Sequence, residues 1–212
     1  MTESTNYSRD FFAMGQIRLS ELSVYNWGSF HGLHSARIDP DGTLITGDNG
    51  SGKSTFIDAL MALLLPAGKA TFNVAAAQGD KADRSLLSYM RGSYGSAHDG
   101  SATRVKSKRE GAVVTALRAA YRADDGSELT LLAMFWTTQA SNALADVKRV
   151  YAVARKNLGL KPVLDAFGEG NARALKQWLR ADEAITCCDE NFAEYQELYR
   201  KLLMMENRNA PA

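Results

Sequence analysis

Residues 44–55, with the sequence LITGDNGSGKST, decide the fold class of this chain. The spacing from Gly47 through Gly52, Lys53 and Ser54 satisfies the phosphate-loop pattern G-x-x-x-x-G-K-[ST]. Glycine tolerates positive φ, so the backbone can turn until successive N–H groups point inward and form a nest for an anion. A helix that begins at this turn adds the positive end of its dipole. The stretch therefore predicts a loop that binds a phosphate group.

The side chains of the loop have separate expected roles. Lys53 is expected to reach the β and γ phosphates of a nucleotide, which makes it the candidate catalytic residue. The Ser54 hydroxyl is the expected Mg²⁺ ligand. The predicted ligands are accordingly ATP and Mg²⁺. Seven residues are expected to hold the nucleotide: Asn49, Gly50, Ser51, Gly52, Lys53, Ser54 and Thr55.

The flanks of the loop agree with this interpretation. Residues 43–46 are β-prone, which predicts a short strand that leads into the loop. Downstream, the apolar residues between positions 56 and 64 predict a helix that is apolar on most sides, lies buried under a sheet and ends before Pro66. Strand, loop and helix in this order form the context that the motif requires. The alternative is a glycine-rich turn that binds nothing, and the agreement of motif and context disfavours it.

Composition sets wider bounds. The chain has 212 residues, enough for one large domain or two small ones. Its 25 basic and 24 acidic residues give a net charge of +1, so global charge predicts no partner. The adjacent Cys187 and Cys188 cannot staple a loop in the usual geometry, which favours a reducing, cytoplasmic compartment. No apolar run approaches the length of a membrane span, so no membrane partner is expected.

Alternation and turn signals predict a sheet. Residues 17–26 alternate with one phase slip near Glu21, which indicates a strand with a bulge. A second strand is expected over 33–38, and residues 112–137 predict a hairpin that turns at Asp125-Gly126. Residues 147–154 alternate cleanly and predict a further strand of an antiparallel sheet beside the phosphate-loop unit.

Three helices are expected beyond the phosphate-loop helix. The first is a short one over 84–91. The second covers 171–180, with Leu175, Trp178 and Leu179 on its apolar stripe. The third opens at Asn191 with a sequence that resembles a capping box. Residues 1–15 are interpreted as a flexible leader.

Residues 92–111 are rich in Gly and Ser and contain the basic cluster Arg104, Lys106, Lys108 and Arg109. They predict an exposed, flexible loop. The functional interpretation of the cluster is contact with the phosphate backbone of DNA. A solvated loop is the favoured interpretation, because no aromatic residues interleave with the charges.

A self-contained ATPase of this class also needs an acidic residue at the end of an apolar strand and a glutamate that orients the attacking water. Only residues 184–190 imitate this arrangement, with Asp189-Glu190 after a weakly apolar run. Thr and Cys suit a buried central strand poorly, and Asp189 is placed to serve the cap of the following helix. The sequence therefore contains what looks like half of an active site.

Six segments of the sequence together carry a resemblance to a known family: 26–30 (NWGSF), 46–60 (TGDNGSGKSTFIDAL), 84–92 (RSLLSYMRG), Phe135-Trp136, 145–147 (ADV) and the helix over 192–203. With these segments the chain resembles the N-terminal part of SMC-type ABC ATPase heads. Within that superfamily it is most similar to the MukB/MksB-like branch, and especially to the JetC subunit of Wadjet anti-plasmid systems.

The resemblance implies a fold and a domain order. The expected fold is an α/β P-loop NTPase of ABC type, with a mixed or antiparallel sheet. Residues 16–188 would form the N-terminal lobe of the head, with the phosphate loop at 47–55, the basic loop at 92–111 and the hairpin at 112–137. Residues 189–212 would form a neck helix that leads to a coiled coil. The second half of the ATPase site, with the Walker B strand, the signature motif, the catalytic glutamate and the Gln that helps hold Mg²⁺, would come from a C-terminal half.

The resemblance also implies partners. In the full protein, ATP would bring the head together with a second copy of itself, and hydrolysis would release the pair. This cycle would drive a motor that acts on DNA with kleisin-like and winged-helix accessory subunits. Arg84 resembles an arginine that reaches the nucleotide or DNA. Gly28 departs from many relatives, which place Lys or Arg there.

Three other functions remain open at this point. A small kinase would show an arginine-rich lid and an acceptor site, which the sequence does not contain. A DNA-repair ATPase head of the RecF or SbcC kind shares the phosphate loop but not residues 84–92 or Phe135-Trp136. The last alternative is a nucleotide-gated interaction module that never hydrolyses its ligand.

Overall fold

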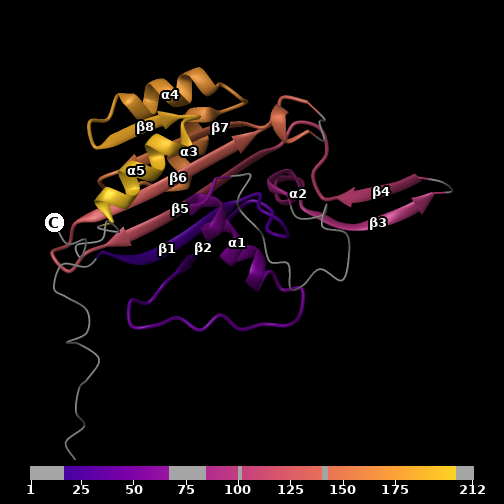
Figure 1. The fold of residues 1–212 in the computed structure, drawn as a ribbon, viewed down its shortest axis with the longest axis horizontal. Coiled ribbons are helices and arrows are strands. Elements are labelled where there is room, and N and C mark those ends of the chain that lie inside the picture. The colour runs from indigo at the N-terminus through magenta and orange to yellow at the C-terminus, as the bar shows by residue number, and fades with distance from the viewer. Residues whose placement is uncertain (1–16, 67–84, 100–101, 140–142, 204–212) are drawn as a thin grey trace, which may run out of the picture.

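An antiparallel sheet of six strands forms the centre of the computed structural model, which describes residues 17–66, 85–99, 102–139 and 143–203 (Figure 1). The strand order is β2-β1-β5-β6-β7-β8, and all five neighbouring pairs are antiparallel. A separate two-stranded sheet, β3-β4, projects from one end. The strands are β1 (Arg18–Tyr25), β2 (Leu33–Arg37), β3 (Ser93–Asp99), β4 (Ala102–Ser107), β5 (Val114–Arg122), β6 (Glu128–Trp136), β7 (Lys148–Ala154) and β8 (Ile185–Asp189).

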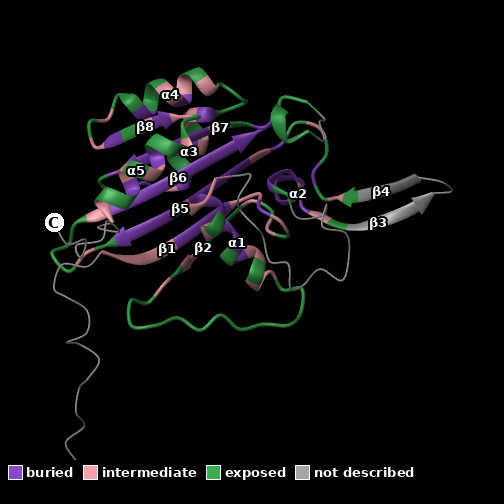
Figure 2. Ribbon diagram, viewed as in Figure 1, coloured by how far each residue is buried: buried purple, intermediate pink, exposed green. Residues whose placement is uncertain are grey.

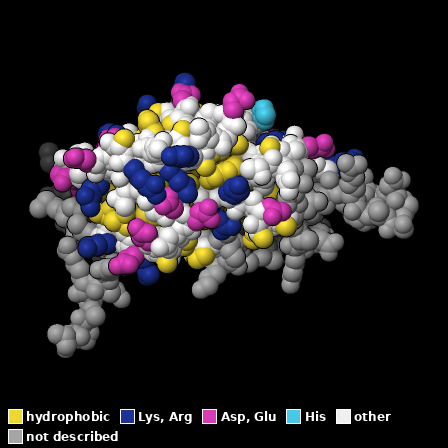
Figure 3. Space-filling model, turned by 90° about the horizontal axis from the view of Figure 1, so that it is seen from above, with side chains coloured by type: hydrophobic (Ala, Val, Ile, Leu, Met, Phe, Trp, Pro, Cys, Tyr) yellow, Lys and Arg dark blue, Asp and Glu magenta, His cyan; other side chains and the backbone are white. Residues whose placement is uncertain are grey.

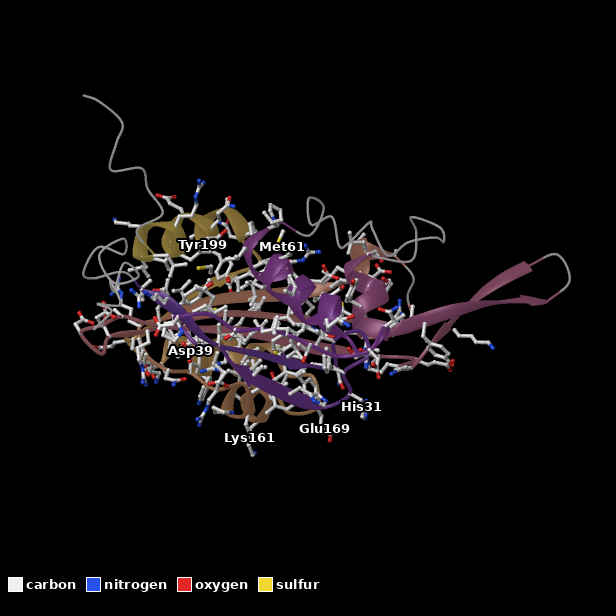
Figure 4. All side chains as sticks on the ribbon, turned by 90° about the horizontal axis from the view of Figure 1, so that it is seen from below. His31, Asp39, Met61, Lys161, Glu169 and Tyr199 are labelled. Atoms are coloured by element: carbon white, nitrogen blue, oxygen red, sulfur yellow. The ribbon has the colours of Figure 1, made fainter. Side chains whose placement is uncertain are left out.

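Helices cover both faces of the large sheet. One face carries α1 (Lys53–Leu64), α2 (Leu86–Arg91) and α5 (Phe192–Leu202), and the other carries α3 (Leu160–Phe167) and α4 (Ala172–Arg180). A 3₁₀ turn, η3 (Leu144–Asp146), precedes β7. Seen from below, Met61 of α1 and Tyr199 of α5 lie on one side of the sheet and Lys161 of α3 on the other (Figure 4). None of the described helices combines the length and apolar character that a membrane crossing needs.

The middle strands are buried on both faces (Figure 2). Along β5, Leu117, Ala119 and Tyr121 pack toward α1, α2 and α5, whereas Ala116 packs toward α3 and α4. Double coverage explains why β5 and β6 are buried at nearly every position rather than at every second one. The predicted hairpin and the predicted strand over 147–154 are confirmed, and so is the bulge near Glu21, where the β1–β5 register shifts between Leu19 and Glu21.

The predicted strand over 43–46 is wrong. These residues take no part in any sheet pairing of the described chain, and Leu44 is 86% exposed. A strand forms only where a neighbour satisfies its backbone N–H and C=O groups. The segment instead runs free of the sheet, between β2 and α1 (Figure 2). The helix that follows is only half covered, because Phe56, Ala59 and Leu63 are buried but Ile57 is 51% exposed.

The expected loop over 92–111 is also wrong, because most of it forms the β3–β4 hairpin. Gly95, Ser96 and the other small residues of this stretch pair through backbone groups without an alternating apolar pattern that the sequence would reveal.

The helices follow the predictions with two exceptions. α2, α4 and α5 lie where expected, and Asn171 and Asn191 cap the last two by accepting hydrogen bonds from Ala174 N and Glu194 N. The prediction misses α3, a helix of eight residues with Pro162 in its first turn. Trp178 was expected on the apolar stripe of α4, yet it is 38% exposed, since Leu175 and Leu179 fill the contact with the sheet. The expected leader over 1–15 and residues 204–212 of the expected neck lie outside the described residues.

Candidate nucleotide-binding site

The phosphate loop takes its shape from glycines in the left-handed region. Gly50 has a φ of 83° and Gly52 a φ of 97°, conformations that side chains rarely permit. Gly52 is the N-cap of α1, and its carbonyl accepts the first helical hydrogen bond from Phe56 N at 2.9 Å. No side chain of the described residues caps this helix. The first backbone N–H groups of α1 are therefore free to bind an anion.

Lys53 folds back over its own loop. Its ammonium donates hydrogen bonds to the carbonyls of Gly47 at 2.5 Å and Asp48 at 2.8 Å. The positive charge is thus held at the mouth of the loop, beside the helix N-terminus. A cation, a helix dipole and turned backbone N–H groups together form the donor set that phosphate requires.

A cavity of about 680 Å³ opens over the loop. Six of the seven residues predicted to hold nucleotide line it: Asn49, Gly50, Gly52, Lys53, Ser54 and Thr55. Ser51 lies in the loop but does not line the cavity. The other walls come from segments that the motif does not identify: Gly28 and Ser29 after β1, Ser88 and Tyr89 of α2, Gly92, Ser93 and Tyr94 at the start of β3, and Lys108 after β4.

Trp27 fixes the turn after β1 against the loop. Its indole is fully buried, donates a hydrogen bond from Nε1 to Thr55 O at 2.8 Å and stacks on Tyr89 with ring centroids 4.6 Å apart. Tyr89 in turn donates from its hydroxyl to the buried Asp58 carboxylate of α1 at 2.5 Å. One aromatic pair therefore joins the phosphate-loop helix, the turn and α2.

Gly28 has no room for a side chain. A Cβ at this position would lie 2.4 Å from Thr55 Cγ2, and the φ of Gly28 is 52°. The backbone N of Gly28 donates to Tyr89 O at 2.7 Å, which holds the turn in place. This packing gives a physical reason for a glycine at position 28.

Arg109 is a structural residue rather than part of a solvated cluster. It is 8% exposed, and its guanidinium donates to four carbonyl oxygens, those of Met90, Phe30, Gly28 and Tyr89. Burial lowers the pKa of Arg109 from its ordinary value. No carboxylate of the described residues forms an ion pair with it, so carbonyl dipoles compensate its charge. The other members of the basic cluster have different surroundings. Lys108 donates a hydrogen bond to Ser29 O at 3.1 Å, and Lys106 is exposed. The side chain of Arg104 and the whole of Arg84 lie outside the described part of the chain.

Asp189 lies far from the phosphate loop in the topology of the sheet. It ends β8, the edge strand opposite β2, whereas α1 packs on β1, β5 and β6. Its carboxylate pairs with Lys176 at 3.3 Å and with Arg180, both on α4. Figure 3 shows the face that carries α4, where basic and acidic side chains are interspersed. The helix cap near Asp189 comes from Asn191 instead.

The chemistry of the site also fits a metal that accompanies a nucleotide. Ser54 lines both the main cavity and a smaller one of about 360 Å³, which also borders Lys53 and Asp58. A single hydroxyl is a weak ligand alone, and Mg²⁺ in such sites takes most of its ligands from phosphates and water. Within the described part of the chain, no three His, Cys, Asp or Glu residues cluster as a metal site.

Comparison with known proteins supports the P-loop assignment. Residues 19–79 match a protein family described as the P-loop containing region of AAA domain. The match spans β1, β2, the phosphate loop and α1. No curated protein matches the chain. The chain therefore contains an α/β P-loop domain of the nucleotide-binding ATPase type.

Proposed function

We propose that this chain binds ATP with Mg²⁺ and forms the N-terminal half of the ATPase head of an SMC-like DNA motor. The observation that carries the nucleotide part is the cavity over the phosphate loop, lined by six of the residues that the motif assigns to phosphate binding. The P-loop family match over residues 19–79 supports the same interpretation.

Each loop residue has one task in this proposal. Backbone N–H groups of Gly50 and of residues 52–55 receive the phosphates, and Lys53 exchanges its hydrogen bonds to Gly47 and Asp48 for bonds to phosphate oxygens. Ser54 offers its hydroxyl to the metal. Mg²⁺, when bound with the nucleotide, neutralises phosphate charge. The anchored turn at Trp27 and Gly28 keeps the loop in its receiving shape.

The proposal of a half head rests on the surface beside the loop. Residues 43–46 have no strand-pairing partner within the described chain, and four apolar side chains of this segment and of α1 are exposed: Leu44, Ile45, Ile57 and Met61. Burial of such groups is strongly favourable, so another protein segment is expected to cover them. A second lobe that places strands beside residues 43–46 would do so and would bring the acidic residues that hydrolysis requires.

The proposed motor function and its partners rest on the resemblance to SMC-type ABC ATPase heads. Two heads would close around ATP and open after hydrolysis, which would drive DNA loop extrusion in plasmid restriction or chromosome organisation. DNA, a second copy of the chain and kleisin-like and winged-helix subunits are the proposed partners. α5 would be the start of a neck helix.

Calorimetric titration of ATP-Mg²⁺ into wild-type protein and Lys53→Ala tests the nucleotide proposal. Loss of a charged hydrogen-bond donor to phosphate is expected to weaken binding about 10- to 100-fold. Lys161→Ala is the matched control, because Lys161 is an exposed lysine on α3 that pairs only with the exposed Asp165 among the described residues. Equal affinities of Lys53→Ala and Lys161→Ala for ATP would contradict the assignment of Lys53 to the phosphate-binding site.

A further inference from the structure

The cavity extends beyond the phosphate loop to a second wall of different chemistry. That wall is formed by Ser29, Ser88, Tyr94 and Lys108, which belong to the turn after β1, to α2 and to the base of the β3–β4 hairpin. Both parts offer an ammonium group and hydroxyls, but the second wall adds an exposed aromatic ring. A ligand that fills both parts has an anionic end at the phosphate loop and a planar end at this ring.

Tyr94 is the unusual member of this wall. It is 64% exposed, although large aromatic side chains gain more than most from burial. The neighbouring aromatic residues of the site, Trp27 and Tyr89, are buried and stacked on each other. Tyr94 is therefore the aromatic ring that the cavity leaves open to a ligand.

The junction from which β3 starts is anchored. Gly92, two residues before Tyr94, has a φ of 63° and accepts a hydrogen bond from Lys108 N at 3.3 Å. A Cβ on Gly92 would lie 2.5 Å from Gly28 O, so α2 and the turn after β1 meet closely at this point. The Arg109 guanidinium bonds to Gly28 O at 2.9 Å and Tyr89 O at 3.1 Å at the same junction. Tyr94 follows at the point where the β3–β4 register shifts, between Ser93 and Gly95.

We propose that Tyr94 is the stacking platform for the nucleobase, and this inference rests on the proposed nucleotide-binding function. Every nucleobase has a π-face, so an open aromatic ring takes it without base-specific hydrogen bonds. Lys108, whose ammonium donates to Ser29 O, adds positive charge on the same wall. The phosphate loop and Tyr94 thus divide the ligand between them: the loop holds the phosphates and the hairpin base holds the nucleoside.

The test compares two ligands on wild type and on variants of the 212-residue chain. ATP and inorganic tripolyphosphate, each with Mg²⁺, are titrated by calorimetry into wild type, Tyr94→Ala and Tyr94→Phe. Stacking of one base on an aromatic side chain corresponds to a change in affinity of about 5- to 150-fold. Tyr94→Ala is expected to lose that much affinity for ATP and none for tripolyphosphate, and Tyr94→Phe is expected to bind both ligands like wild type. Trp178→Ala, which removes another exposed aromatic residue on α4, is the control and is expected to change neither affinity.

Three results would overturn the stacking proposal while leaving the nucleotide site intact. They are an unchanged ATP affinity in Tyr94→Ala, an equal loss for ATP and tripolyphosphate, or a loss in Tyr94→Phe as large as in Tyr94→Ala. Two other results would contradict the proposed nucleotide-binding function itself. Wild type would bind neither ligand, or Lys53→Ala would bind both ligands with the affinity of wild type. In that case the stacking proposal falls with it.

Discussion

Gly28 shows how a single residue away from the motif shapes the site. Its missing side chain lets the turn after β1 touch Thr55 of the phosphate-loop helix and Tyr89 of α2. Gly32, four residues later in the same turn, also has a positive φ, of 76°, but a Cβ there would meet nothing within 4 Å. Substitutions at these two glycines therefore separate the free-energy cost of a side chain at positive φ from the cost of a steric clash.

Gly28→Ala is expected to lower the free energy of unfolding by about 2–5 kcal/mol, since a strained φ costs about 1–2 kcal/mol and overpacking adds about 1–3 kcal/mol. Gly32→Ala is expected to lose only the first part, about 1–2 kcal/mol. Urea denaturation of both variants measures the difference. Equal losses would mean that Thr55 moves aside without cost and that the contact at Gly28 does not shape the loop.

The residues of the site divide sharply in how well the sequence predicts them. Gly50, Gly52, Lys53 and Ser54 follow from spacing alone, because the motif is local in the chain. The prediction of a solvated charge at Arg109 is wrong, because its guanidinium donates to carbonyls that lie far away in the sequence, at positions 28, 30, 89 and 90. A polar side chain that serves distant backbone groups leaves no periodic signal in its own segment.

At the scale of elements, α5 is joined to the phosphate-loop helix by one hydrogen bond. The Tyr199 hydroxyl donates to Leu64 O, at the C-terminal end of α1, at 2.7 Å. Tyr195, one turn earlier on α5, is fully buried, and its hydroxyl has no partner among the described residues. Met61 of α1 and Tyr199 lie on the same side of the sheet (Figure 4). Tyr199 and Tyr195 can therefore be compared directly, because they lie on one helix and differ in whether the hydroxyl has a hydrogen-bond partner among the described residues.

Tyr199→Phe is expected to destabilise the protein by about 1–3 kcal/mol, because it leaves a helix-end carbonyl without its donor. Tyr195→Phe is expected to be neutral or stabilising, since it removes a buried hydroxyl that makes no hydrogen bond within the described part. Thermal denaturation of both variants checks the order. A larger loss in Tyr195→Phe than in Tyr199→Phe would contradict this account of the α1–α5 contact.

Elements with a repeated apolar pattern are well predicted, and those without one are not. β5, β6 and β7 alternate or run apolar over seven to nine residues, and a clear turn at Gly126 joins the first two. The β3–β4 hairpin is built mostly from Gly, Ser and polar residues and pairs only with itself among the described strands, so its sequence looks like a loop. Residues 43–46 show the opposite error, because a β-prone sequence forms no strand without a neighbour to pair with.

At the scale of the molecule, four of the eight large apolar side chains that are exposed among the described residues belong to the segment before the phosphate loop and to α1: Leu44, Ile45, Ile57 and Met61. Ile57 borders the smaller cavity together with Ile45, and both are exposed. Ile57→Gln is expected to reduce binding of an apolar fluorescent dye, because it removes the centre of this patch. Leu144→Gln is the control, since Leu144 is an exposed apolar residue elsewhere, in η3.

Both substitutions are expected to change the free energy of unfolding by less than about 1 kcal/mol, because the side chains are partly solvated already. Dye fluorescence at equal protein concentration is the measurement. Equal fluorescence of Ile57→Gln and wild type would show that this side of the molecule does not behave as an apolar patch, and it would remove the main support for a covering lobe.

A nucleotide that binds in the cavity between the phosphate loop, the turn after β1 and α2 shields the backbone amides around it. Hydrogen–deuterium exchange with and without saturating ATP-Mg²⁺ measures this shielding, because exchange reports which backbone amides a ligand protects. We expect slower exchange in peptides that cover residues 47–55, 26–30 and 88–94. Binding of ATP without protection of residues 47–55, or with protection confined to other segments, would show that the nucleotide does not occupy this cavity.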